Sequence, residues 1–218
     1  MAAMPRSTPI NKALGRPRDV DSSATRRDLL EGARRIFARD GFEATTNRSI
    51  AEVVGITSGA MYHYYPSKAE LFAAVYDQAQ SIVYDGFEKA VAAPGSLTER
   101  FQRVLDAAVE FNRDDPSLAG FLVTVPLEVQ RHPELADLMA PRRSRSGGFI
   151  SQMVAMAMAN DEFVEGVQAQ AVEDIIAIVV SGLAIFSTIN GDADRHAAAV
   201  RALSQFLEGD LVRRPAPG

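Results

Sequence analysis

The sequence predicts an all-α protein, with a small helix-turn-helix unit near its N-terminus and a larger helical part after it. Apolar residues recur at helical spacing along most of the 218 residues, whereas the alternation typical of strands is scarce. No repeat of about 20–50 residues is visible, so a solenoid is not expected. We divide the chain into an arm over residues 1–21, a helix-turn-helix unit over residues 22–68 and a larger helical domain over residues 69–218.

Charge is distributed unevenly along the chain. Residues 1–48 hold ten Lys or Arg against six acidic residues, and residues 81–218 hold twelve against nineteen. A basic N-terminal part joined to an acidic remainder favours nucleic-acid contact at one end only. The net charge of -5 argues against a protein that coats nucleic acid without specificity.

The N-terminal arm is rich in Pro, Ser, Thr and Arg and lacks periodic apolar positions, so we expect residues 1–21 to be flexible. Within it, the run Gly15-Arg16-Pro17-Arg18 resembles the core of an AT-hook. In that role Arg16 and Arg18 would enter an A·T-rich minor groove beside the main DNA contact. A solvated tail is the alternative.

The first helix is predicted over about residues 23–39, with Gly41 after its end as the residue that takes a positive φ. Its apolar face consists of Leu29, Leu30, Ala33, Ile36 and Phe37. Arg26, Arg27 and Arg34 fall on its polar side, where we expect solvent rather than phosphate as their partner.

Two short helices joined by a tight turn are predicted over residues 45–65. Thr46 suits the N-cap of the first helix, because its hydroxyl can accept from an otherwise unpaired backbone N–H. Gly55 can take a positive φ and so permits the turn. Thr57 or Ser58 caps the second helix, which runs to about Tyr64. The inward residues are Ile50, Val53, Val54, Met61 and Tyr65.

The outward side of the second helix carries residues that suit a recognition helix in a DNA major groove. Ser58 lies near the helix N-terminus, where backbone N–H groups attract phosphate. Gly59 and Ala60 let the backbone approach base edges. Tyr62, His63 and Tyr64 carry hydrogen-bonding tips for phosphates or bases. A plain pair of antiparallel helices is the alternative.

A long helix is predicted over about residues 67–92, with Ser67 as its N-cap. Lys68 stands where its ammonium group could bind a phosphate. Because this helix would belong to both parts of the protein, we expect it to transmit movement between them.

Further helices are predicted over about residues 96–112, 118–130, 132–138, 141–159, 172–189 and 194–212. The segment 172–189 is apolar on nearly every side, which is typical of a helix buried all round. It is short for a membrane span and is interrupted by polar and small residues, among them Ser181 and Gly182. We therefore expect it to be covered by its own domain on one side and by a second copy of the chain on the other.

The run TTNRSIAEVVGITSGAMYHYYPSKAELFAAV, residues 45–75, closely resembles the DNA-binding signature of the TetR (tetracycline-repressor) family. The matching residues are Thr46, Arg48, Ile50, Ala51, Gly55, Ile56, Thr57, Gly59, Tyr62, Tyr64, Ser67, Lys68 and Leu71. Val54, Met61 and Tyr65 replace the usual Ala, Leu and Phe, which leaves each position apolar or nearly so.

This resemblance implies a repressor that binds a palindromic operator in double-stranded DNA and is released by a small-molecule effector. It also implies a homodimer, in which the last two long helices pair with their equivalents and hold two recognition helices about 34 Å apart. The residues expected at the DNA are Thr46, Arg48, Thr57, Ser58, Gly59, Ala60, Tyr62, His63, Tyr64 and Lys68. The candidates for an effector pocket are Phe101, Phe121, Phe149, Met153, Met156 and Phe186. The alternative is a helical ligand-binding or protein-interaction module that no longer reads DNA.

The sequence gives no indication of catalysis, of a cofactor or of a metal site. His63, His132 and His196 do not stand in metal-ligand spacing. No nucleophile elbow, P-loop or dinucleotide-binding glycine motif occurs. Cysteine is absent, and the N-terminus lacks the apolar stretch of a signal peptide. We expect a cytoplasmic protein that is not an enzyme.

Overall fold

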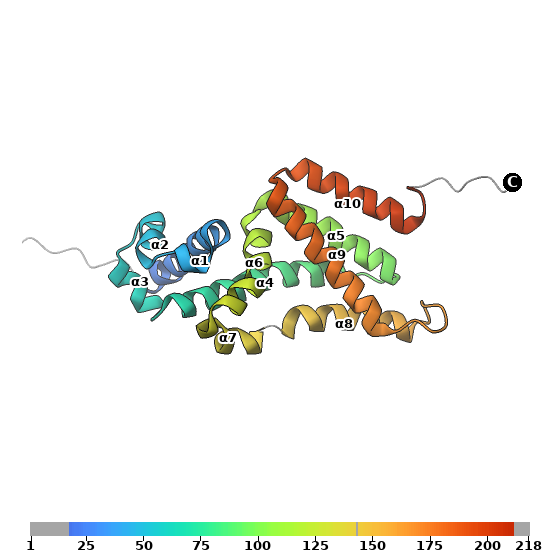
Figure 1. The fold of residues 1–218 in the computed structure, drawn as a ribbon, viewed down its shortest axis with the longest axis horizontal. Helices are drawn as coiled ribbons and strands as arrows, with labels where there is room; N and C mark the ends of the chain where they lie inside the picture. The colour runs from blue at the N-terminus through green and yellow to red at the C-terminus, as the bar shows by residue number, and fades with distance from the viewer. Residues whose placement is uncertain (1–17, 143, 212–218) are drawn as a thin grey trace, which may run out of the picture.

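The computed structural model describes residues 18–142 and 144–211, and over that part the chain forms ten α-helices and one short 3₁₀ helix. The all-α prediction is confirmed. Helices α1 to α3 gather at one end, and α4 runs from them into the larger part of the molecule (Figure 1). The elements are α1 (Arg18–Ala44), α2 (Asn47–Val54), α3 (Ser58–Tyr64), α4 (Lys68–Ala90), α5 (Leu97–Asp114), α6 (Ser117–Arg131), α7 (Pro133–Met139), η1 (Ala140–Arg142), α8 (Ser144–Ala159), α9 (Ala169–Asn190) and α10 (Ala193–Glu208).

Helix α1 starts earlier than the sequence suggests. It begins at Arg18, so the arm expected over residues 1–21 is helical from residue 18 on. Arg16 lies outside the described residues, and minor-groove contact by Arg16 and Arg18 stays a prediction. At the other end, Gly41 interrupts the helix with a φ of 78°, as expected, and Thr45 Oγ1 donates to the Gly41 carbonyl oxygen at 2.6 Å.

The two short helices of the predicted helix-turn-helix are present, and local hydrogen bonds fix their ends. Thr46 Oγ1 accepts from the backbone N–H of Ser49 at 3.0 Å, and Ser49 Oγ accepts in return from the Thr46 N–H at 3.2 Å. Gly55 takes the left-handed conformation that turns the chain. Thr57, rather than Ser58, caps α3 by accepting from the Ala60 N–H at 3.1 Å.

Helix α2 packs closely on α1 because position 32 has no side chain. A Cβ added to Gly32 would lie 2.6 Å from Val54 Cγ2. Ile50 and Ala51 are buried on the same side of α2. The prediction that Val53 also points inward is wrong, since its side chain is 61% exposed. Successive residues of a helix point about 100° apart. With Ile50, Ala51 and Val54 on the side that faces the protein, Val53 points to solvent.

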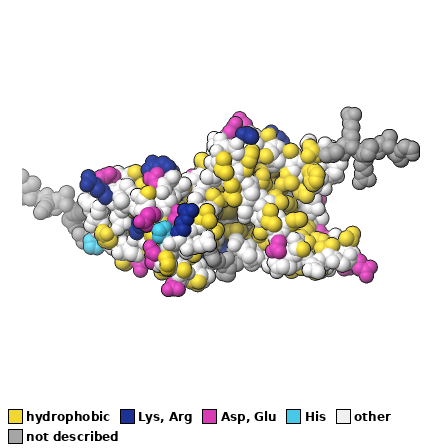
Figure 2. Space-filling view, viewed as in Figure 1, with side chains coloured by type: hydrophobic (Ala, Val, Ile, Leu, Met, Phe, Trp, Pro, Cys, Tyr) yellow, Lys and Arg dark blue, Asp and Glu magenta, His cyan; other side chains and the backbone are white. Residues whose placement is uncertain are grey.

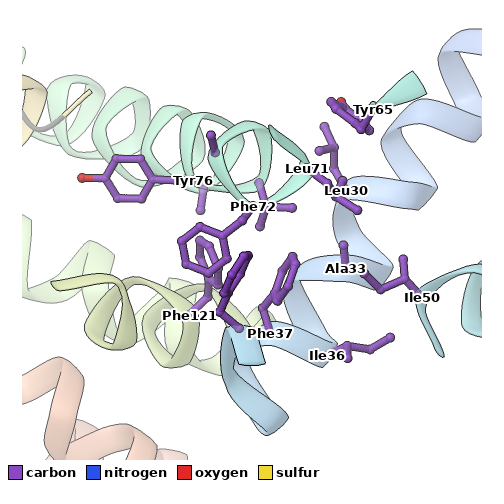
Figure 3. Packing of buried hydrophobic residues seen from close by; sticks show 14 of the residues in the cluster. Leu30, Ala33, Ile36, Phe37, Ile50, Tyr65, Leu71, Phe72, Tyr76 and Phe121 are labelled. Atoms are coloured by element: carbon purple, nitrogen blue, oxygen red, sulfur yellow. The ribbon is translucent and has the colours of Figure 1, made fainter. Parts of the chain in front are cut away.

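The main hydrophobic core joins the N-terminal helices to the larger part of the chain. The rings of Phe37, Phe72 and Phe121 come from α1, α4 and α6 and lie together between these helices (Figure 3). The Phe72 centroid is 5.0 Å from that of Phe37 and 5.0 Å from that of Phe121. Leu135 and Met139 of α7 are fully buried in the same cluster. Helices α1 and α6 are therefore in direct contact through this core.

A second core lies in the remaining half and is built from the end of α4 with α5, α8, α9 and α10. Its buried members include Phe87, Leu105 and Phe149, with Ile176 from α9 and Val200 from α10. Between the two cores α4 is continuous, so it contributes to both, as the sequence suggests.

Helix α9 is apolar but little covered by its own chain. By length and composition it could cross a membrane, and only 11% of its most apolar window is buried. Ile175, Ile178, Ile185 and Ile189 form an exposed stripe along it. Hydrophobic side chains gather on this side of the molecule, over α9 and α10 (Figure 2). The sequence predicts that its own domain covers one side of α9, and the second side is exposed in the single chain.

Candidate DNA-binding surface and ligand cavity

The residues predicted to contact DNA come together around α3. Thr46, Arg48, Thr57, Gly59, Tyr62 and His63 are exposed, and Ser58, Ala60, Tyr64 and Lys68 are partly buried. A Cβ on Gly59 would meet nothing closer than Thr57 Oγ1 at 3.9 Å, so this side of α3 is open to close approach.

Tyr62 is an exposed aromatic side chain on this surface. It is 51% exposed, and its hydroxyl oxygen accepts from Asn47 Nδ2 at 2.8 Å. Because the amide supplies that proton, the hydroxyl's own proton remains available to an outside acceptor. Asn47 was not among the predicted residues. Its pairing with Tyr62 spans two helices, and no local pattern in the sequence marks it.

Arg48 and Lys68 differ in how far their charged groups are hydrogen-bonded within the chain. The Arg48 side chain is 84% exposed, although its Nε donates to Glu52 Oε1 at 2.8 Å. The Lys68 ammonium donates to the carbonyl oxygens of Phe42, Glu43 and Thr45 at 2.7, 3.3 and 3.0 Å.

The Lys68 ammonium is engaged within its own chain. Its ammonium has three protons to donate, and all three are directed at the last turn of α1 and at Thr45, which follows it. It also lies 4.3 Å from the centroid of the Phe42 ring. These hydrogen bonds join α4 to α1, and the phosphate contact of Lys68 stays a prediction. Tyr64 likewise packs partly against the main core, whereas we expected it to face outward.

Arg34 ties α1 to the start of α6. Its side chain is 3% exposed and forms an ion pair with Asp115. Its Nε donates to Ser117 Oγ at 3.1 Å, and its Nη1 donates to Gln78 Oε1 at 3.5 Å. The expectation that Arg34 faces solvent is wrong. Its partner on the chain is 81 residues away, so the helical pattern of α1 alone does not reveal the contact.

The charge state of Asp115 reflects this contact. Burial by itself would raise the pKa of its carboxyl, but the hydrogen bonds from Ser117 and the charge of Arg34 outweigh burial and hold the pKa below its usual value. The carboxylate is thus ionised at neutral pH and pairs with a guanidinium that has little access to water.

A cavity of about 680 Å³ lies within the larger part of the molecule, among α4, α5, α6, α8, α9 and the start of α10. Most of its wall is aliphatic or aromatic, with Phe87, Leu105, Phe111, Leu122 and Ile150 among the lining residues. The polar lining residues are Tyr76, Gln80, Tyr84, Asn112, Ser146, Ser181, Ser187 and His196. No Asp, Glu, Lys or Arg is among the described residues that line it.

Position 86 of α4 helps to shape this cavity. A Cβ added to Gly86 would lie 2.1 Å from Phe111 Cζ. The glycine therefore lets the Phe111 ring of α5 lie against α4, where it forms part of the wall.

None of the six residues predicted to line an effector pocket is in this wall. Phe101, Phe121, Phe149 and Met153 are buried in the two cores. Met156 is 36% exposed, and the guanidinium of Arg195 lies over the Phe186 ring at 5.3 Å. The part of the wall that α9 contributes includes the small residues Ala177, Ser181 and Ala184, which leave space that larger side chains would fill. The sequence pattern shows which residues are apolar but not which of them leave a gap.

His196 is a cavity residue with unused hydrogen-bonding capacity. It is 2% exposed, and its Nδ1 is buried without a partner. Burial lowers the pKa of this imidazole below its usual value, so the ring is neutral at physiological pH. Burial likewise raises the pKa of Tyr84, more than its hydrogen bond with Ser146 lowers it.

Comparison with family models gives two matches along the chain. Residues 29–75 match the model described as bacterial regulatory proteins, tetR family. Residues 97–211 match the model described as BetI-type transcriptional repressor, C-terminal.

Individual relatives agree with these models. The chain is 42% identical over 57 residues to the HTH-type transcriptional repressor AcnR of Corynebacterium diphtheriae, a match that covers 26% of this chain and 30% of AcnR. It is 20% identical over 194 residues to the HTH-type transcriptional regulator UidR of Escherichia coli K12, covering 88% and 96%. The fold resembles that of FadR from Bacillus subtilis in complex with stearoyl-CoA, with a TM-score of 0.71, 15% identity, and 85% and 99% of the two chains covered.

Proposed function

This chain belongs to the tetR family of bacterial regulatory proteins, and from that premise we propose that it is a transcriptional repressor that binds a palindromic operator as a homodimer and is released by a small-molecule effector. The unit that reads DNA is α1 to α3, the transmitting elements are α4 and α6, and the cavity takes the effector.

The observation that carries this proposal is the outer side of α3. Thr57 caps a short helix whose exposed side presents Gly59, Tyr62 and His63 with no bulky apolar residue between them. A small residue in the first turn lets the helix enter the major groove closely, and the N–H groups there favour phosphate. Tyr62, held by Asn47, is oriented to donate its hydroxyl proton to a phosphate or a base acceptor.

Dimerisation follows from the exposed stripe on α9. Ile175, Ile178, Ile185 and Ile189 are all at least 47% exposed and follow helical spacing. Gly182 lies within this stripe, and a Cβ added there would meet nothing within 4 Å, so a second helix can approach closely. Phe206 and Leu207 of α10 add to the apolar surface. A two-fold axis through this surface would give the pair of recognition helices that a palindrome needs.

Release by an effector needs a path from the cavity to α1. The cavity is walled in part by α4 and α6, and α6 packs against α1 in the main core. Arg34 fastens the same two elements at Asp115 and Ser117. A tenfold change in DNA affinity requires only about 1.4 kcal/mol of difference in ligand binding between the two states.

The proposal is tested by fluorescence anisotropy with duplexes that flank the chain's own gene. We expect specific binding that weakens steeply with salt, because several phosphates are neutralised in each half-site. Arg48→Ala should reduce both the affinity and the salt dependence, whereas Arg113→Ala, an exposed arginine on α5, should change neither. If no duplex is bound above the non-specific level, the chain is instead a helical module that does not read DNA.

A further inference from the structure

We infer that the cavity ligand is an uncharged, mainly apolar molecule with one hydroxyl or carbonyl oxygen, which hydrogen-bonds to His196. The inference rests on the proposed function only in taking this cavity for the effector site.

The first argument is the absence of charge in the wall. Among the described lining residues the polar groups are hydroxyls, amides and one imidazole, without a carboxylate, ammonium or guanidinium. Moving an ion out of water is strongly unfavourable unless an opposite charge or several hydrogen bonds meet it. A ligand carrying a carboxylate or an ammonium group would find no such partner in this wall.

Arg145, Arg34 and Arg100 are either engaged elsewhere or outside the cavity wall. The Arg145 guanidinium, next to Ser146 in the wall, forms an ion pair with Asp85 and donates to Ser81 Oγ at 3.2 Å. Arg34 is held by Asp115 and Ser117. Arg100 is buried with its Nε and Nη1 unpartnered, but it is not among the lining residues. None of these can neutralise an anion in the cavity without first leaving its present place.

The second argument concerns His196 among the polar groups of the wall. Gln80 Nε2 donates to the Tyr76 hydroxyl oxygen at 2.7 Å, so these two groups satisfy each other in part. The Tyr84 hydroxyl is hydrogen-bonded with Ser146. His196 is 2% exposed and its Nδ1 has no partner. A buried polar atom without a partner is unfavourable, so a ligand oxygen that hydrogen-bonds to this ring gains affinity.

The neutral state of His196 limits which kind of ligand oxygen can hydrogen-bond to it. A neutral imidazole has one N–H donor and one acceptor nitrogen, and either can bond to a hydroxyl, while the donor can bond to a carbonyl. A fully charged imidazolium would have suited an anionic ligand, but burial opposes that state. The volume of about 680 Å³ lies within the range of pockets that hold drug-sized molecules.

The test uses the full chain at pH 7.5 and isothermal titration with five probes that each carry a ten-carbon chain: decane, 1-decanol, decanoate, decylammonium and decanoyl-CoA. We expect 1-decanol to bind with one site per chain and at least tenfold more tightly than any of the three charged probes. Equal or tighter binding of a charged probe contradicts the inference of an uncharged ligand. Binding of none of the probes contradicts it as well.

The role of His196 is tested with His196→Phe, which keeps a planar ring and removes both nitrogens. The ratio of 1-decanol affinity to decane affinity should fall about threefold to tenfold, the effect of one net hydrogen bond. His196→Gln retains a donor and an acceptor and should keep most of that ratio, which guards against a folding defect in the Phe variant. An unchanged ratio in His196→Phe overturns the assignment of His196.

The outcome for the ligand can be separated from the outcome for the proposed function. Anisotropy of the DNA complex is followed while 1-decanol is added. Binding of 1-decanol without release of DNA supports the ligand class and contradicts release by this ligand. Absence of DNA binding with intact 1-decanol binding contradicts only the repressor.

Discussion

Replacing Arg34 by Met should destabilise the fold strongly, because it leaves Asp115 without its buried partner. Methionine keeps much of the length and apolar volume of the arginine stem while removing the charge and the donors. The Arg34 side chain is 3% exposed and that of Asp115 is 25% exposed. Removing one partner of a buried pair costs about 3–5 kcal/mol, and we expect about 2–3 kcal/mol because water still reaches the Asp115 carboxylate.

The assay is urea unfolding followed by circular dichroism at pH 7.5 and one fixed protein concentration, since a dimer's stability depends on concentration. Arg35→Met is the matched control, because Arg35 is 62% exposed and its nitrogen lies 4.0 Å from Glu31. We expect the control to change the free energy of unfolding by about 0.5 kcal/mol or less. Values for Arg34→Met and Arg35→Met that agree within that margin would refute the reasoning.

The pH dependence of the same measurement gives a second check. Because the pKa of Asp115 is lowered in the folded chain, its contribution is present above the unfolded pKa of about 4 and is lost as the pH falls through the lower folded pKa. The wild type should therefore lose stability over this acidic range by more than Arg34→Met does. Equal losses in the two proteins would show that Arg34 does not set the charge state of Asp115.

The remaining predictions concern Lys68, His196 and Asn47. Lys68→Met should lower the free energy of unfolding, measured with urea, by about 1–3 kcal/mol, because three carbonyl oxygens lose their donor. Unchanged stability would contradict the role of Lys68 in joining α4 to α1. Because burial lowers the pKa of His196, the unfolded chain takes up a proton below about pH 6.5 that the folded chain does not, so stability should fall between pH 7 and pH 5. This fall should be smaller in His196→Phe, and an equal fall in both would contradict the assignment. Asn47→Ala should weaken operator binding in the wild type but hardly in a Tyr62→Phe background, as measured by anisotropy, and equal losses in the two backgrounds would show that Asn47 does not act through Tyr62.

Local signals in the sequence predicted the helix-turn-helix well. Thr46, Gly55 and Thr57 act through hydrogen bonds and backbone angles within a few residues, and the structure has them in the predicted roles. Met61 and Tyr65 point inward for the same reason, since helical spacing alone decides their side. The long helix α4 and its Ser67 cap also follow from short-range rules.

Contacts between distant segments were not predictable in the same way. Lys68 was predicted to contact a phosphate. Its hydrogen bonds to three carbonyl oxygens depend on the position of the end of α1 in the fold, which the sequence around Lys68 does not show. The pattern of α1 places Arg34 on the polar side of the helix, and only the fold brings Asp115 into contact with it. The cavity wall depends on gaps among five long helices and the start of α10, and the sequence carries no periodic signal for a gap.

The central claim is that two copies of this chain act together, each presenting α3 to one half of a duplex. The most direct test is the mass of the complex, measured by sedimentation, between the full chain and a duplex from the region flanking its own gene. The account predicts two or a multiple of two chains per duplex, and a dimer in the absence of DNA that Ile178→Asp separates. A stable single chain with no affinity for any of these duplexes would contradict it.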